Sequence, residues 1–397
     1  MTVDQDTEQA DDAGQVHGQT PGQPRGVAAA VGRMIGMLLG ELFTLLGRGI
    51  DRGFVFVESW LVNVKHARYG ISVTRILLGI TGLGVLATNF RTRLYTYGSG
   101  SAWNGEAAQP RSDFPNMWLF SLFHKLALHD VAFTIAYLLL AVLAVIVILG
   151  WRTKLFLPIY FVAWVSFIEV NDALTDQGDN IYRITLLLLL FADTAGRWSM
   201  DARRRSRPQA QRGRVVSRIW HGGAYMPAWI SNTAHNLVLV ALTAQVCFVY
   251  ASGALYKAGG TPWQHGYAIY NPLHTDRFGP WPVLSDLFTA WGPLVVMVSW
   301  ASIIIQMCFP LMLLRRSTRI IALFGIGGFH VGIAVLMGLP WFSLAMIAID
   351  SIFIRDTTWA KAGRKISHTW RDANHLTAGA KSLTGETRPK TAERPHA

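Results

Sequence analysis

Residues 131–150 read VAFTIAYLLLAVLAVIVILG, a stretch of twenty positions without a charged side chain. The hydrocarbon core of a bilayer is about 30 Å thick, and roughly 20 apolar residues cross it as a helix. Lipid offers no hydrogen-bond partner to a free backbone N–H or C=O, so a segment in that environment has to be helical. This stretch therefore predicts a transmembrane α-helix.

Further apolar blocks of similar character lie on both sides of this one. The chain is 51% hydrophobic and only 15% charged, whereas a soluble domain carries about 25% charged residues. We expect an all-α fold, a polytopic transmembrane bundle of about eight spans. The expected spans are 69–90, 131–150, 155–170, 181–195, 236–256, 287–314, 320–338 and 341–354.

Arginine and lysine gather in every second connection between these spans. Basic residues lie before the first span, in the turn with Arg152 and Lys154, in the arginine-rich segment 197–218, in the turn 315–319 and after the last span. The alternate connections are acidic or mixed, with one weak exception, the first outer loop. Because lysine and arginine mark the cytoplasmic side, we expect a plasma-membrane protein with both termini in the cytoplasm.

The net charge of +12 has the same origin. Basic loops beside apolar blocks are typical of topology and of contact with anionic lipid, so we expect membrane lipids as partners and no nucleic acid. Cys247 and Cys308 both lie in apolar blocks and offer no disulfide framework. The histidines show no metal-ligand spacing with a carboxylate, so we expect no metal site.

Four regions follow from this pattern. Residues 1–30 are polar and predict a disordered tail. Residues 31–64 are apolar but interrupted by charge, which favours an amphipathic interfacial segment. Residues 65–356 form the transmembrane domain, and 357–397 predict a basic, disordered tail.

The segment 171–183, NDALTDQGDNIYR, opens the fourth expected span from the outer side. Two interpretations are open. In the first, Asp179 is an N-cap and Arg183 extends towards the interface, so that the segment is only a capped helix start. In the second, Asp179, Asn180 and Arg183 form the rim of a polar cavity between helices.

Lys257 ends the fifth expected span and is followed by Gly259, Gly260, Pro262 and Trp263. A lysine at the end of a span is commonly an interfacial anchor. In a desolvated pocket, however, a lysine becomes a usable general base. Both interpretations are kept.

His330 lies near the middle of the seventh expected span, between small residues that permit close helix approach. At that depth it has to bond a neighbouring helix or line a cavity. Mutual pairing is the first explanation for the other polar residues buried in the spans, namely Arg75, Glu169, Gln245, Gln306 and Asp350. The predicted topology puts Arg183, Lys257 and His330 towards the outer face, where a site would open.

A spaced set of residues resembles a known family over about residues 65–356. The set comprises Gly178-Asp179-Asn180-Ile181-Tyr182-Arg183, Arg197-Trp198-Ser199-Met200-Asp201, Tyr256-Lys257 with Trp263 and Gly266, His330, and Trp341-Phe342-Ser343. It is similar to the HTTM family, the horizontally transferred transmembrane domain proteins, which are related to vitamin K-dependent gamma-carboxylase.

This resemblance implies an enzyme that acts on a reduced quinone, such as menaquinol or a vitamin K hydroquinone, or on a lipid. In the carboxylase a lysine deprotonates the hydroquinone, and Lys257 matches that base. The resemblance thus implies Lys257 and His330 as catalytic residues and Asp179, Asn180, Arg183 and Trp263 as substrate-binding residues. No clear counterpart of an important carboxylase histidine occurs near 179–180, and no large domain follows the spans, which argues against glutamate carboxylation.

Some relatives imply a second function, a non-catalytic maturation or assembly factor for a secreted peptide or protein partner. The two hypotheses differ in what they expect of the structure. An enzyme predicts a lipid-sized cavity lined by Arg183, Lys257 and His330, whereas a scaffold predicts a packed bundle in which the same residues pair. A small-solute transporter is a weaker third possibility, because the sequence shows no internal repeat.

Overall fold

The computed structural model describes residues 25–105, 109–206, 218, 220 and 226–383. Over these residues every regular element is a helix, which confirms the all-α prediction. The chain divides into two units, residues 1–59 and residues 60–397, which are described separately.

A single helix, α1 (Arg25–Val62), accounts for the described part of the first unit. It begins within the segment 1–30, for which disorder was predicted, because the run from Arg25 to Val31 is rich in alanine, the best helix former. Residues 1–24 lie outside the described residues. Apolar side chains of α1, among them Met37, Phe43 and Phe54, are exposed. The interfacial location of this helix stays a prediction.

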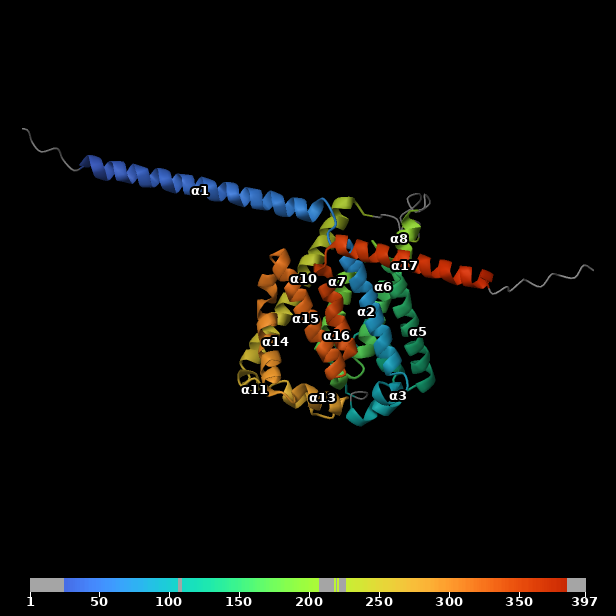
Figure 1. Ribbon diagram of the computed structural model, residues 1–397. Helices are drawn as coiled ribbons and strands as arrows, with labels where there is room; N and C mark the ends of the chain where they lie inside the picture. Colours follow the sequence, from blue (N-terminus) through green and yellow to red (C-terminus); the bar gives the residue numbers. More distant parts are fainter. Residues whose placement is uncertain (1–24, 106–108, 207–217, 219, 221–225, 384–397) are drawn as a thin grey trace, which may run out of the picture. The chain divides into compact units, whose positions relative to one another are not determined.

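Within the described residues, five helices are long and apolar enough to cross a membrane (Figure 1). They are α2 (Arg68–Thr88), α5 (Asp130–Leu149), α10 (Ala228–Ala258), α14 (Gly292–Met312) and α15 (Arg316–Leu336). Two shorter apolar helices are α6 (Thr153–Ile168) and α16 (Pro340–Asp350), which continues into η6 (Ser351–Phe353). The count of eight spans, the cytoplasmic termini and the plasma membrane stay predictions.

Two expected spans differ from the helices observed. The span expected over 287–314 is divided into α13 (Pro282–Thr289) and α14. Pro293 lies in the first turn of α14, lacks an N–H and disfavours a helical residue before it, so a helix starts there but does not run through. The span expected over 181–195 is α7 (Gln177–Leu189), which ends six residues early and is followed by turns.

Helix α16 joins the other helices of the second unit. It packs against α2 and α7 and also against α15, while α2 packs on α5 and α10 packs on α14 (Figure 1). Gly84 of α2 permits a close approach of α16, because a Cβ there would lie 2.2 Å from the ring of Trp341. The start of α16 is thereby held against the end of α2.

Short helices make up most of the connections. They are α3 (Arg93–Thr96), η1 (Ser99–Asn104), η2 (Phe114–Asn116), η3 (Trp118–Phe120), α4 (Leu122–Leu126), η4 (Asp172–Leu174), α8 (Met200–Arg205), α11 (Thr261–Gln264) and α12 (Tyr270–Leu273).

Residues 357–397 were expected to be a basic, disordered tail, and helix α17 (Asp356–Leu383) covers the first part of that segment. Its first turn is tied to the bundle. The Asp356 carboxylate accepts hydrogen bonds from the backbone N–H groups of Arg68 and Tyr69, each at 3.0 Å. Trp359 donates to the Ser351 carbonyl and its ring lies against Trp198. The polar composition of this segment gave no indication of these contacts. Residues 384–397 lie outside the described residues.

Candidate functional site

The first turn of α7 begins with a capping box. Asp176 Oδ1 accepts from the backbone N–H groups of Gly178 and Asp179, and Asp179 Oδ2 accepts from the N–H of Asp176. Asp176 is therefore the N-cap and Asp179 the third helical residue. The expectation that Asp179 is the N-cap was wrong, because a second acidic residue three positions earlier takes that place.

Arg183 pairs with Glu169 rather than with Asp179. Its guanidinium forms a close ion pair with Glu169, at the carboxyl end of α6, and its Nε donates to Asn180 Oδ1 at 3.1 Å. Glu169 is only 2% exposed, so it needs such a partner. Two of the predicted substrate-binding residues, Asn180 and Arg183, thus already hold α6 and α7 together.

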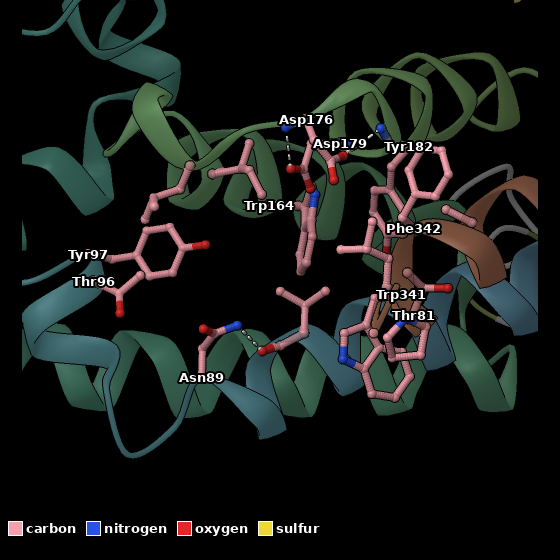
Figure 2. A pocket seen from close by; sticks show the side chains of 18 residues that line it. Thr81, Asn89, Thr96, Tyr97, Trp164, Asp176, Asp179, Tyr182, Trp341 and Phe342 are labelled. Carbon is pink, nitrogen blue, oxygen red and sulfur yellow. Dashed lines mark hydrogen bonds between the residues drawn. The ribbon is translucent and has the colours of Figure 1, made fainter. Parts of the chain in front are cut away.

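A cavity of about 270 Å³ lies where the ends of α2, α6, α7 and α16 meet (Figure 2). Its polar lining includes Thr81, Asn89, Thr96, Tyr97, Asp176 and Asp179. Of the residues singled out from the sequence, Asp179 lines this cavity, whereas Asn180, Arg183, Lys257, Trp263 and His330 do not. The cavity expected to join Arg183, Lys257 and His330 is therefore not this one.

The two carboxylates of the cavity form no ion pair within the part of the chain that the structure describes. Neither Asp176 nor Asp179 forms an ion pair with a described residue, and no lysine or arginine lines the cavity. Asp179 lies ahead of the apolar stretch that begins at Ile181. Burial, together with the neighbouring charge of Asp176, raises the pKa of Asp179 to about 7.

Lys257, in the last turn of α10, also lacks an acidic partner. Its Nζ donates to Gln306 Oε1 of α14 at 2.7 Å. The same atom lies 5.2 Å from the centre of the Trp263 ring and 4.9 Å from that of Phe329. Among the described residues, no carboxylate lies within ion-pair distance of it. The neighbours of the Lys257 ammonium group are thus a neutral amide and two aromatic rings.

His330 of α15 is 1% exposed and bonds a neighbouring helix. Its Nε2 lies 3.1 Å from the Tyr250 hydroxyl of α10, and that hydroxyl donates to Asp350 Oδ2 of α16 at 2.7 Å. With the hydroxyl proton directed at Asp350, His330 Nε2 is the donor to Tyr250. Among the described residues, no hydrogen-bond partner is found for His330 Nδ1 or Asp350 Oδ1.

Aromatic side chains connect these groups. Phe329 lies beside Lys257, and its ring centroid is 5.2 Å from that of His330. On the other side of His330, the Phe342 ring lies at 5.9 Å and also lines the cavity with Asp179. The structure therefore brings Lys257, Trp263 and His330 into one cluster and Asp179 into the cavity, with Phe342 in contact with both.

Trp164 and Tyr250 contribute to these groups but were not singled out from the sequence. For Tyr250 a signal existed, because it precedes Lys257 by two helical turns and therefore shares its face of α10. Phe342 was quoted within Trp341-Phe342-Ser343, but no pattern in the sequence indicates that it reaches His330.

Comparison with known proteins agrees with this architecture. The model of the HTTM domain matches residues 70–359, well over half of the chain. Neither a curated protein nor a solved structure matches. With its apolar, membrane-length helices, this chain is a membrane protein that belongs to the HTTM domain family.

Proposed function

We propose that this protein is a membrane-embedded enzyme in which Lys257 removes a proton from a quinol or lipid substrate on the outer side of the membrane. The observation that carries the proposal is the environment of Lys257. Amines act as general bases in their neutral form, which apolar surroundings favour and a neighbouring carboxylate opposes. Lys257 has Trp263, Phe329 and the neutral amide of Gln306 as neighbours.

The residues around Lys257 fit a flat aromatic substrate. A reduced quinone would supply acidic hydroxyl groups and two electrons at such a site. Trp263 and Phe329 offer ring faces on which an aromatic ring can pack. Gln306 accepts one hydrogen bond from Lys257 Nζ and so orients the nitrogen.

His330, Tyr250 and Asp350 support this site from the interior. They form a continuous hydrogen-bonded chain across α15, α10 and α16. His330 Nδ1 has no hydrogen-bond partner among the described residues and can accept a proton, while Tyr250 fixes the orientation of the imidazole. In this proposal His330 is the second proton-handling group, and Tyr250 and Asp350 are positioning residues.

The test is consumption of menaquinol by the purified protein in air-saturated nanodiscs, compared with protein-free nanodiscs. Dissolved dioxygen is supplied as the acceptor of the two electrons and two protons that the quinol loses on oxidation to the quinone. We expect Lys257→Met to lower the protein-dependent rate by about 100-fold or more, which is the usual contribution of a general base. Lys361→Met removes an exposed lysine of α17 and serves as the matched control. Equal rates in the two variants would remove Lys257 from the catalytic role.

One observation favours the second candidate function, a maturation or assembly factor for a secreted partner. Asn180 and Arg183 are engaged with each other and with Glu169, as a packed scaffold predicts. If the protein is such a maturation factor, a cell that carries Lys257→Met would still mature its exported partner. Comparison of the secreted peptides of cells with the native chain, with Lys257→Met and without the gene separates the two functions.

A further inference from the structure

The lining of the cavity between α2, α6, α7 and α16 contains two carboxyl groups and no lysine or arginine. Asp176 and Asp179 each use one carboxylate oxygen in the capping box. No hydrogen bond to a described residue is recorded for Asp176 Oδ2 or Asp179 Oδ1. Arg183 is the nearest candidate cation on α7, but it is engaged with Glu169 and Asn180. A ligand with a positive charge and N–H donors would complement these two oxygens.

Trp164 provides an independent indication that the cavity takes a ligand. It is 1% exposed, yet no described residue accepts a hydrogen bond from its indole Nε1–H. Figure 2 shows the indole extending into the cavity beside Asp176 and Asp179, between Tyr97 and Phe342. A buried donor without an acceptor costs about 1–3 kcal/mol, so an acceptor atom on a ligand would stabilise this arrangement.

Aromatic side chains form much of the remaining wall. Tyr97, Trp164, Tyr182, Trp341 and Phe342 all line the cavity. The Tyr182 hydroxyl is bonded to the Leu78 carbonyl and to Tyr160, so this side chain presents its ring. Aromatic faces together with carboxylates form the environment in which proteins hold alkylammonium groups.

We propose that this cavity binds an alkylammonium group on a ligand that also carries a hydrogen-bond acceptor for Trp164. The ammonium contacts the free oxygens of Asp176 and Asp179, and the acceptor, a phosphate ester or a hydroxyl, receives the Trp164 N–H. This site is separate from Lys257, which does not line the cavity. Its function does not depend on Lys257 being a base.

The same chemistry occurs in a soluble phosphoamine and in the headgroup of an aminophospholipid, so the test has two arms. In the first, isothermal titration in detergent compares glycerophosphoethanolamine with glycerophosphoglycerol, which lacks the amine. In the second, native mass spectrometry compares lipids retained from nanodiscs of phosphatidylglycerol with and without phosphatidylethanolamine. Binding in both arms indicates the headgroup chemistry alone, and binding only in the second identifies an intact lipid.

Variants tie any binding to this cavity. Asp179→Asn keeps the acceptor for the Asp176 N–H but loses the charge, and we expect at least about tenfold weaker binding of the amine probe. Trp164→Phe keeps a ring but loses the N–H, with a smaller loss expected. Asp172→Asn is the matched control, because Asp172 lies in the same connection but does not line the cavity.

Two outcomes would overturn the proposal. One is the absence of amine-dependent binding in both arms, with the native protein folded. The other is equal binding by Asp179→Asn and Asp172→Asn. Glycerophosphoethanolamine is not a quinol, so its binding is measured independently of menaquinol turnover. Loss of menaquinol turnover in Lys257→Met with unchanged amine binding would therefore separate the two sites.

Discussion

The rings of Phe342 and His330 lie 5.9 Å apart, and Phe342 also lines the cavity that contains Asp179. One side chain of α16 therefore contacts both the carboxylate cavity and the buried chain formed by His330, Tyr250 and Asp350. Phe342 also packs tightly on α7, because a Cβ at Gly178 would lie 2.7 Å from its ring. This side chain separates the two polar groups and holds α16 against α7.

Removal of the Phe342 ring should connect the cavity with His330. We expect Phe342→Ala to increase modification of His330 by diethylpyrocarbonate several-fold, measured by peptide mass spectrometry. The variant should also lose about 2–4 kcal/mol of stability, as large-to-small core substitutions do. Phe342→Leu keeps most of the volume and should react like the native chain. His265 is exposed and provides an internal standard in each sample. An unchanged His330 signal in Phe342→Ala would mean that other atoms shield the imidazole.

Asp179 should make the protein less stable as the pH rises. Burial and the charge of Asp176 raise the pKa of Asp179 to about 7, from the ordinary aspartate value of about 4. Glu169, Arg183 and the nearby Tyr97 are the other titratable groups around it. Between these values the folded state retains a proton that the unfolded state has lost, so the free energy of unfolding falls from about pH 4 to pH 7. Asp179→Asn should remove this contribution. Thermal unfolding of both chains at pH 5 and pH 8 measures it, and parallel changes in the two would exclude Asp179 as the cause.

Arg75 should be among the residues most needed for folding. This side chain belongs to α2 and is completely buried. It donates to the backbone carbonyl of Ile148, near the end of α5, and to those of Thr194 and Trp198, in the turns between α7 and α8. Arg75→Leu would leave these acceptors unpaired, with an expected loss of about 3 kcal/mol or more. Arg371→Leu, at an exposed position of α17, is the control. Unfolding in detergent by a graded denaturant compares the two, and a loss of similar size in both would contradict the structural role.

The sequence predicted the long helices well because their signal is local. Each of α2, α5, α10 and α15 contains most of an expected span, since about twenty consecutive apolar residues carry the information. The partners of the buried polar residues were much less accessible. Arg75 was expected to pair with another side chain but bonds carbonyls, and Asp350 meets a tyrosine 100 positions away in the sequence.

The candidate site was predicted only in its parts for the same reason. Lys257 and Asp179 were singled out because an ionic group near lipid requires an explanation. Their neighbours Gln306, Phe329 and Trp164 come from other helices, and only the packing of α6, α7, α14 and α15 decides which of them meet. Sequence distance carries no information about these contacts.

The hydroxyl of Tyr250 should matter both to stability and to the proposed reaction. Among the described residues, this hydroxyl is the hydrogen-bond partner of both His330 Nε2 and Asp350 Oδ2. Tyr250→Phe would therefore leave both atoms buried without a hydrogen bond. We expect the free energy of unfolding to fall by about 1–3 kcal/mol. Tyr256→Phe is the matched control. It makes the same change on the same helix, α10, but at a side chain that is 86% exposed. If His330 handles a proton, Tyr250→Phe should also shift the pH profile of menaquinol consumption, whereas a purely structural role would lower the amount of folded protein and leave that profile unchanged. A variant as stable and as active as Tyr256→Phe would remove the hydrogen-bonded chain from the proposed mechanism.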